Sequence, residues 1–143
     1  MFNLGWEADV ILKLILACVF GGMIGVLREQ EKKAAGLRTH MLVCMGAALF
    51  VVISLFIESK YIGVDVGRIA SNVVIGIGFI GAGTIIQSRE GSVIGITTAA
   101  SIWVTAAIGV ALGFGMYITA LTAMVLAVIA LKFLGHIEKR FFK

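Results

Sequence analysis

The chain has 143 residues, of which 60% are hydrophobic and 14% are charged, and its mean hydropathy is +1.08. So little polar surface excludes a water-soluble globule and predicts a membrane protein, with residues 1–143 forming a single transmembrane domain. The formal net charge of +4 does not indicate nucleic-acid binding, because the basic residues flank apolar segments and no groove-reading or base-stacking motif accompanies them.

Five apolar stretches are each close to the roughly 20 residues that a membrane-spanning helix needs. They cover residues 8–27, 39–57, 69–88, 93–113 and 116–134. The links between them are short, so the sequence predicts an all-α bundle of five transmembrane helices in which consecutive helices are antiparallel neighbours. The acidic start of the chain is unlike a signal peptide, and we expect the first span to be retained.

The distribution of basic residues predicts the orientation of the bundle. Nine of the twelve Lys and Arg residues fall in the first link, in the third link and in the C-terminal segment from Lys132. The positive-inside rule then places the N-terminus outside and the C-terminus in the cytoplasm. Lys13 and Lys132 lie near span ends, where we expect their amino groups to extend to the interface, and Trp6 and Tyr117 are candidate anchors on the outer side.

Small residues in the first and fourth spans favour close helix packing. Gly21 and Gly25 form a small-xxx-small pair, typical of helix contacts in membranes, with a pore wall as the alternative. The fourth span places Thr98 on one face together with further small or hydroxyl residues, namely Ser101, Thr105 and Gly109, and Gly113 is a further candidate for helix packing. This face predicts either hydrogen bonding between helices or a path for a solute.

The third span is unusual for its glycines. They are Gly76, Gly78, Gly81 and Gly83, and they fall on both sides of the helix. We therefore expect neighbours on both sides and a central place in the bundle, although a broken helix lining a midplane site is an alternative. Asn72 lies about one turn inside the membrane, where an amide is costly unless paired, so it is expected to hydrogen-bond a neighbouring helix or contact a solute.

The first link carries a dense cluster of charges that begins at Arg28. Good helix formers are expected to continue the first helix into the cytoplasm, with Glu29 paired to Lys32 or Lys33. Gly36 fits a left-handed turn that ends this helix, and Thr39 is expected to cap the second span, with Arg38 at the membrane boundary. Orientation and capping are one interpretation of this pattern; a docking surface or a site for an anionic group is the alternative.

Four ordered motifs resemble the MgtC/SapB family of membrane proteins. They are GxxIGxxRE at residues 21–29, AGLRTH at 35–40, RIAxxVVxGIGFIGAG at 68–83 and GITTAASIW at 95–103. The resemblance implies a bacterial inner-membrane protein. For some members it implies a role in adaptation to low magnesium, survival inside host cells and restraint of the proton-translocating ATP synthase. The virulence members carry a further C-terminal soluble domain, and we expect this chain to be a short form without it.

The favoured hypothesis is a regulatory or interaction protein of the bilayer. We expect it to be homo-oligomeric, because its small-residue faces are numerous, and to have another membrane complex as a further partner. The residues proposed for this role are Arg28, Glu29, Gly36, Arg38, Thr39, Asn72, Thr97 and Thr98. No catalytic residue, metal site or cofactor is expected, since no Asp or Glu lies deep in a span and no Ser, Cys or His has an evident partner base. His40 and His136 are expected to be solvated or interfacial. The alternatives are a small-solute or ion transporter or channel subunit and, less favoured, an acyltransferase-like enzyme.

Overall fold

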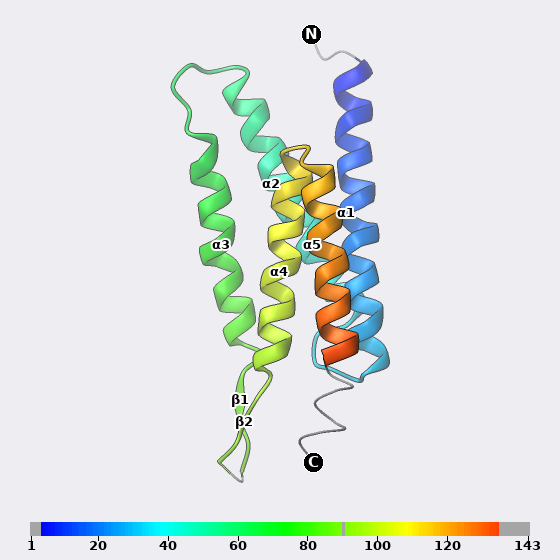
Figure 1. The fold of residues 1–143 in the computed structure, drawn as a ribbon. Coiled ribbons are helices and arrows are strands. Elements are labelled where there is room, and N and C mark those ends of the chain that lie inside the picture. The colour runs from blue at the N-terminus through cyan, green and yellow to red at the C-terminus, as the bar shows by residue number, and fades with distance from the viewer. Residues whose placement is uncertain (1–3, 90, 135–143) are drawn as a thin grey trace.

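The computed structural model describes residues 4–89 and 91–134, and these form a bundle of five α-helices (Figure 1). The helices are α1 (Leu4–Gln30), α2 (Leu37–Glu58), α3 (Val66–Ala82), α4 (Ile96–Gly113) and α5 (Tyr117–Ile129), and a π-helical turn (Ala130–Leu134) continues α5. The predicted five-helix fold is confirmed. Helices α1, α2 and α4 are long and apolar enough to cross a membrane, whereas α3 and α5 are shorter apolar helices.

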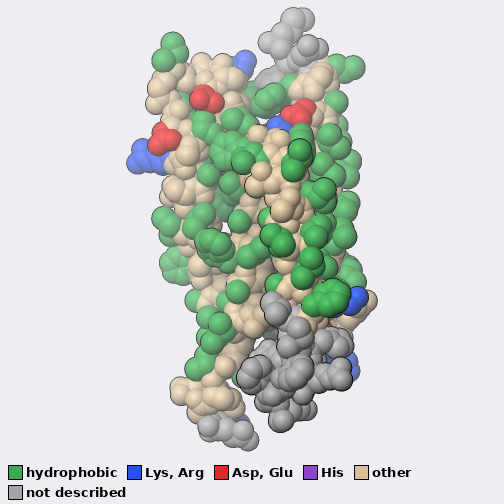
Figure 2. Space-filling view, viewed as in Figure 1, with side chains coloured by type: hydrophobic (Ala, Val, Ile, Leu, Met, Phe, Trp, Pro, Cys, Tyr) green, Lys and Arg blue, Asp and Glu red, His purple; other side chains and the backbone are tan. Residues whose placement is uncertain are grey.

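Hydrophobic side chains cover the face of the bundle shown in Figure 2, and Lys, Arg, Asp and Glu lie toward its two ends. Many large aliphatic side chains are exposed along the helices, including Ile11, Ile75 and Leu126. This is the distribution that a helical bundle needs when acyl chains rather than water surround it.

Helices α2 and α4 form the centre of the bundle, and α1 packs on both of them. Glycines set the distance between α2 and α4. A methyl group placed on Gly109 would lie 2.9 Å from Cβ of Ala47, and one placed on Gly113 would lie 2.5 Å from Cβ of Val51. The two helices can therefore approach this closely only where α4 carries no side chain.

Glycines play the same part where α1 crosses α2. A methyl group on Gly21 would lie 2.5 Å from the carbonyl oxygen of His40, and one on Gly25 would lie 2.7 Å from Cα of Leu37. Both glycines are buried. The contacts of Gly21, Gly25, Gly109 and Gly113 are thus made inside one chain, so these faces give no surface for a second copy.

The prediction that α3 is central is wrong. It lies at one side of the bundle, against α2 and α4 (Figure 1). Methyl groups placed on Gly76 or Gly78 would meet no atom within 4 Å, and one on Gly83 would meet only carbonyl oxygens of α3 itself. Gly81 alone among the four faces another helix, at Ala99 of α4. Because α2 and α4 already pack through their own small residues, they leave α3 a peripheral place. The alternative of a broken third span is also wrong, since α3 is continuous.

A β-hairpin replaces the predicted junction of the third and fourth spans. Strands β1 (Ile86–Gln87) and β2 (Val93–Ile94) pair antiparallel, so α3 ends six residues before the predicted boundary at residue 88. Gly91 and Gly95 both adopt positive φ, and three of the four strand residues, Ile86, Val93 and Ile94, are β-branched. Apolar character alone could not separate this segment from a helix, but its glycines and β-branched residues favour a hairpin.

The base of the hairpin depends on Gly95. Its φ is 95°, and a methyl group there would collide with the carbonyl group of Thr84. We expect Gly95→Ala to open the hairpin and to speed proteolysis within residues 84–95 by about tenfold relative to Gly91→Ala, because the collision with Thr84 adds to the strain of about 1–2 kcal/mol that a left-handed alanine brings at either position. Gly91→Ala is the matched control, because its φ is 84° but no atom lies within 4 Å of the added methyl group. Equal cleavage rates for both variants would contradict this account.

The opposite end of the bundle is fixed by a buried lysine. Lys13 Nζ lies 2.7 Å from Asp9 Oδ2, and the hydroxyl of Tyr117 donates to Asp9 Oδ1 at 2.8 Å. The side chain of Lys13 is only 8% exposed, so other residues cover it although its amino group extends toward the start of α1. It pairs with Asp9 one turn earlier in α1, and Tyr117 ties this pair to α5.

Candidate functional site

Four buried polar side chains meet where the end of α1, the start of α2 and the start of α4 converge. They are Arg28, His40, Thr98 and Ser101, which we call the polar cluster. Each comes from the first or last two turns of its helix, at the end of the bundle that also carries the first link and the hairpin (Figure 1). The close approach at Gly25 brings α2 near enough to α1 to cover these groups.

Arg28 is the buried cation of the polar cluster. Its Nη2 donates to Thr98 Oγ1 at 2.7 Å, and its Nη1 lies 3.2 Å from Glu31 Oε2. The side chain of Arg28 is 3% exposed, whereas that of Glu31 is 35% exposed. Nε of Arg28 is the one buried side-chain nitrogen or oxygen among the described residues that has no hydrogen-bond partner. The guanidinium therefore joins α1 to α4, and only these two contacts offset the free energy that burying its charge costs.

His40 is completely buried, so the expectation of a solvated or interfacial histidine is wrong for this residue. His136 lies outside the described residues. Nδ1 of His40 lies 2.9 Å from the Gly36 carbonyl oxygen, and Nε2 lies 3.1 Å from Ser101 Oγ. Sequence reasoning found no serine with a partner base, but the fold supplies one because α2 and α4 cross at this point.

The hydrogen bonds of His40 and Ser101 depend on a single hydroxyl proton. Nδ1 must carry a proton to donate to the Gly36 carbonyl oxygen, so in neutral His40 the Nε2 atom accepts from Ser101. Ser101 Oγ also lies 2.8 Å from the carbonyl oxygen of Thr98 and can donate only once. The pair is enclosed between helices, and it serves to join α2 to α4.

Glu29 caps α2 from across the first link. Its Oε2 accepts from the backbone N–H of Leu37 at 2.9 Å, and Gly36 precedes that residue with φ −112°. A methyl group on Gly36 would collide with the Glu29 carboxylate. Glycine is thus required here for space and not for the left-handed turn that we predicted; Lys32, with φ 54°, takes the left-handed conformation.

Thr39 does not cap the second helix, because α2 begins at Leu37 and the carboxylate of Glu29 occupies the capping position. Arg28 pairs with Glu31, and the expected ion pair of Glu29 with Lys32 or Lys33 is not formed among the described residues. Arg38 and Thr97 are exposed, and Thr39 is half-buried. The structure therefore brings Arg28 together with Thr98 and Glu29 together with Gly36. Arg38, Thr39 and Thr97 lie outside the polar cluster.

The hairpin carries an exposed apolar surface beyond the helix ends (Figure 1). Five aliphatic side chains are each at least 43% exposed: Ile85, Ile86, Val93, Ile94 and Ile96. We call these five residues the hairpin surface. Arg89, in the turn, is also exposed. Because α4 starts at Ile96, the bond between Arg28 and Thr98 fixes the helix turn from which the hairpin projects.

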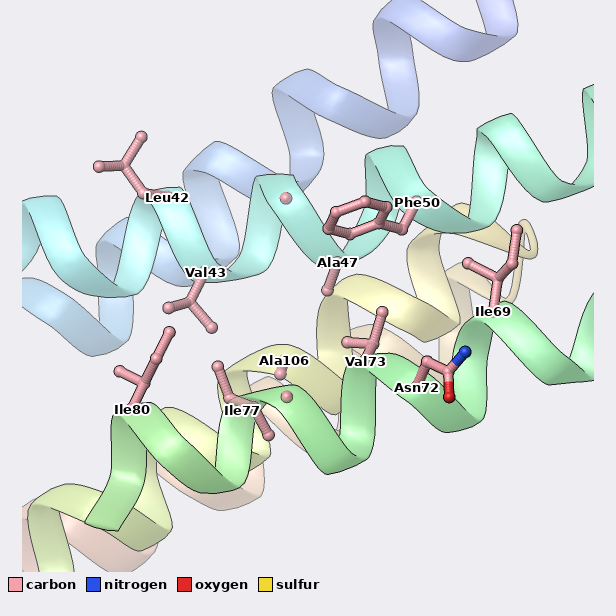
Figure 3. A pocket seen from close by; sticks show the side chains of 12 residues that line it. Leu42, Val43, Ala47, Phe50, Ile69, Asn72, Val73, Ile77, Ile80 and Ala106 are labelled. Carbon is pink, nitrogen blue, oxygen red and sulfur yellow. The ribbon is translucent and has the colours of Figure 1, made fainter. Parts of the chain in front are cut away.

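Asn72 is far from the polar cluster and lines a groove between α2 and α3 (Figure 3). The groove has a volume of about 660 Å³ and otherwise apolar walls, including Phe50, Gly76 and Ile80. The expected hydrogen bond from Asn72 to a neighbouring helix is not formed among the described residues. Those residues also contain no group of three or more His, Cys, Asp or Glu side chains placed to hold a metal ion.

Comparison with known proteins decides the family. The model of the MgtC family matches residues 14–140. The chain belongs to the MgtC family. Three bacterial relatives show how closely this MgtC-family chain matches known sequences. It is 45% identical over 130 residues to a protein of Escherichia coli K12 named putative magnesium transporter YhiD, covering 87% of this chain and 60% of that protein.

It is 43% identical over 121 residues to Protein MgtC of Salmonella typhimurium LT2, covering 84% of this chain and 50% of MgtC. An uncharacterised Haemophilus influenzae protein is 33% identical over 129 residues, with 86% of this chain and 54% of that protein covered. The MgtC-family chain thus spans about half to three fifths of the length of these relatives. No solved structure matches it significantly.

Proposed function

We propose that this MgtC-family chain is a regulatory protein of the bacterial plasma membrane that binds another membrane protein through its hairpin surface. The observation that carries this proposal is the exposure of five aliphatic side chains on a hairpin that projects from the bundle. Exposed apolar residues grouped in this way are typical of an interaction site. In the orientation expected from the basic residues, this surface lies on the cytoplasmic side.

The polar cluster gives the hairpin a fixed support. Arg28 holds the first turn of α4 through Thr98, and His40 holds the second turn through Ser101. Rigid support lowers the entropy lost when a surface binds a partner. The residues of the family motifs thereby act together, because they orient the hairpin surface without contacting the partner themselves.

The same geometry supports regulation over transport. Thr98, Ser101 and Thr105 are buried, with exposures of 3%, 6% and 0%. The hydroxyl of Thr105 donates to the carbonyl oxygen of Ser101, one turn earlier in its own helix. The hydroxyl face of α4 is thus filled by neighbouring helices and gives no open path for a solute.

The name of the Escherichia coli relative refers to magnesium transport, and we propose that any link of this chain to magnesium is indirect. Mg²⁺ prefers a near-octahedral set of oxygen ligands and releases water reluctantly. Support comes from the described residues, which hold no cluster of carboxylates for such a site. The regulated partner would be a membrane complex such as the proton-translocating ATP synthase, the target implied for some family members.

The docking role is tested with the paired variant Ile86→Ser/Ile94→Ser. These residues face each other across the hairpin, so the backbone pairing is kept while the apolar surface is lost. In affinity capture from native membranes, we expect this variant to co-purify at least about tenfold less partner than the wild type. A tenfold loss of affinity corresponds to about 1.4 kcal/mol of binding free energy. Ile62→Ser is the matched control, because Ile62 is fully exposed in the link between α2 and α3. Equal capture by both variants would reject docking at the hairpin.

Transport is tested separately by solute flux into liposomes that contain the purified protein. We expect no flux above that of protein-free liposomes for Mg²⁺ or for monovalent cations. Flux that falls in both Asn72→Ala and Thr98→Ala would contradict the regulatory proposal and favour a path between α2, α3 and α4.

A further inference from the structure

The groove between α2 and α3 runs along the middle of α3. Phe50, Ile69 and Asn72 lie at one end of it, and Leu42 and Ile80 lie at the other (Figure 3). Small residues of three helices also line it, namely Ala47, Gly76 and Ala106. Protein interiors rarely leave such a volume empty, so this groove, which opens on the apolar side of the bundle, needs an occupant from its surroundings.

We propose that the groove binds one acyl chain of a membrane phospholipid, whose ester and phosphate groups are held by Asn72 and Arg68. The proposal concerns a part of the molecule separate from the hairpin surface and does not depend on the proposed function. It accounts for the one polar side chain in an otherwise apolar wall.

The length of the groove favours an acyl chain over a helix. Ile69 and Ile80 are eleven residues apart in α3, or about 16 Å at 1.5 Å per residue. A second helix that crosses the membrane spans a hydrocarbon core about 30 Å thick, roughly twice the length of the groove. An acyl chain is also thinner than a helix, whose diameter with side chains is about 10 Å. A second copy of this chain would therefore leave much of its own helix without contact.

The polar residues on α3 are spaced as a phospholipid headgroup requires. Asn72 follows Arg68 by four residues, so the two lie on nearly the same face and about 6 Å apart along the helix axis. The amide of Asn72 can donate to a glycerol ester carbonyl, while the guanidinium of exposed Arg68 can pair with the phosphate nearer the interface. Asp65, the nearest carboxylate along the chain, accepts from the N–H of Gly67 at the start of α3.

The experiment measures phospholipid bound to purified, delipidated protein after phosphatidylglycerol is added in mild detergent, by native mass spectrometry. Gly76→Leu fills the groove, and Gly78→Leu is the matched control because Gly78 does not line it. A methyl group at either position meets no atom within 4 Å, so both variants should fold. We expect Gly76→Leu to lower the fraction of protein carrying one phospholipid at least fivefold and Gly78→Leu to leave it unchanged.

Arg68→Gln provides an independent test, because this exposed side chain lies outside the packed core. It is expected to lower phospholipid retention at least threefold without changing the unfolding temperature. Retention that is the same in wild type, Gly76→Leu and Arg68→Gln would overturn the proposal. So would a dimer that carries no lipid and dissociates in Gly76→Leu, since a second copy would then occupy the groove.

Discussion

Thr98→Val is expected to destabilise the bundle by about 2 kcal/mol, the cost of removing a buried hydrogen bond to a charged group. The substitution keeps the size of the side chain but removes the oxygen that accepts from Arg28 Nη2 at 2.7 Å. Because Nε of Arg28 already has no partner, the buried guanidinium would keep only its contact with Glu31. The measurement is unfolding in detergent, followed by circular dichroism.

Thr97→Val is the matched control, since Thr97 is the preceding residue of the same helix turn but is exposed. Its effect should stay within about 0.5 kcal/mol, as for most surface substitutions. If Thr98→Val proved as harmless as this control, Arg28 would not be holding α1 to α4, and the support that we assign to the polar cluster would be absent.

Gly109→Ala is expected to cost about 1–3 kcal/mol, the range for overpacking a close contact. The added methyl group would lie 2.9 Å from Cβ of Ala47 and against the backbone of Cys44, which cannot move without displacing α2. Alanine favours a helix over glycine by about 1 kcal/mol, so a net loss of stability would show that close packing outweighs helix propensity at this position. The same unfolding assay measures it.

Gly46→Ala controls for helix propensity alone. It is also a glycine to alanine change within a membrane helix, but no atom lies within 4 Å of the added methyl group. We expect no loss of stability and a gain of up to about 1 kcal/mol. A loss in Gly46→Ala as large as that in Gly109→Ala would mean that contact between α2 and α4 does not explain the requirement for glycine.

The number of helices could be predicted from the sequence because membrane spans depend on local hydropathy. The ends of α3 and α4 could not be predicted in the same way, since residues 84–86 and 93–94 are as apolar in a hairpin as they would be at the ends of two helices. The peripheral position of α3 depends on which glycines meet other helices. In the sequence, Gly76 and Gly109 both lie among apolar residues inside a predicted span. In the structure, only Gly109 lies against the backbone of a neighbouring helix.

The candidate site was predicted only in part. The motifs indicated Arg28, Glu29, Gly36 and Thr98, but not that Arg28 contacts Thr98, 70 residues away. His40 was missed because a histidine at a predicted boundary resembles a solvated one until α4 covers it. Ser101 was expected on the same face of α4 as Thr98, which it follows by three residues, but its partner His40 was not predicted.

Site-specific photo-cross-linking in native membranes shows whether the hairpin surface contacts a partner protein. A photoreactive phenylalanine analogue is placed at Val93 in the hairpin surface and, as a control, at Leu126, which is exposed on α5. Our account predicts a discrete protein adduct from position 93 that disappears in the Ile86→Ser/Ile94→Ser background, and only lipid adducts from position 126. Lipid adducts alone from position 93 would contradict it, because the hairpin surface would then face the bilayer and not a partner.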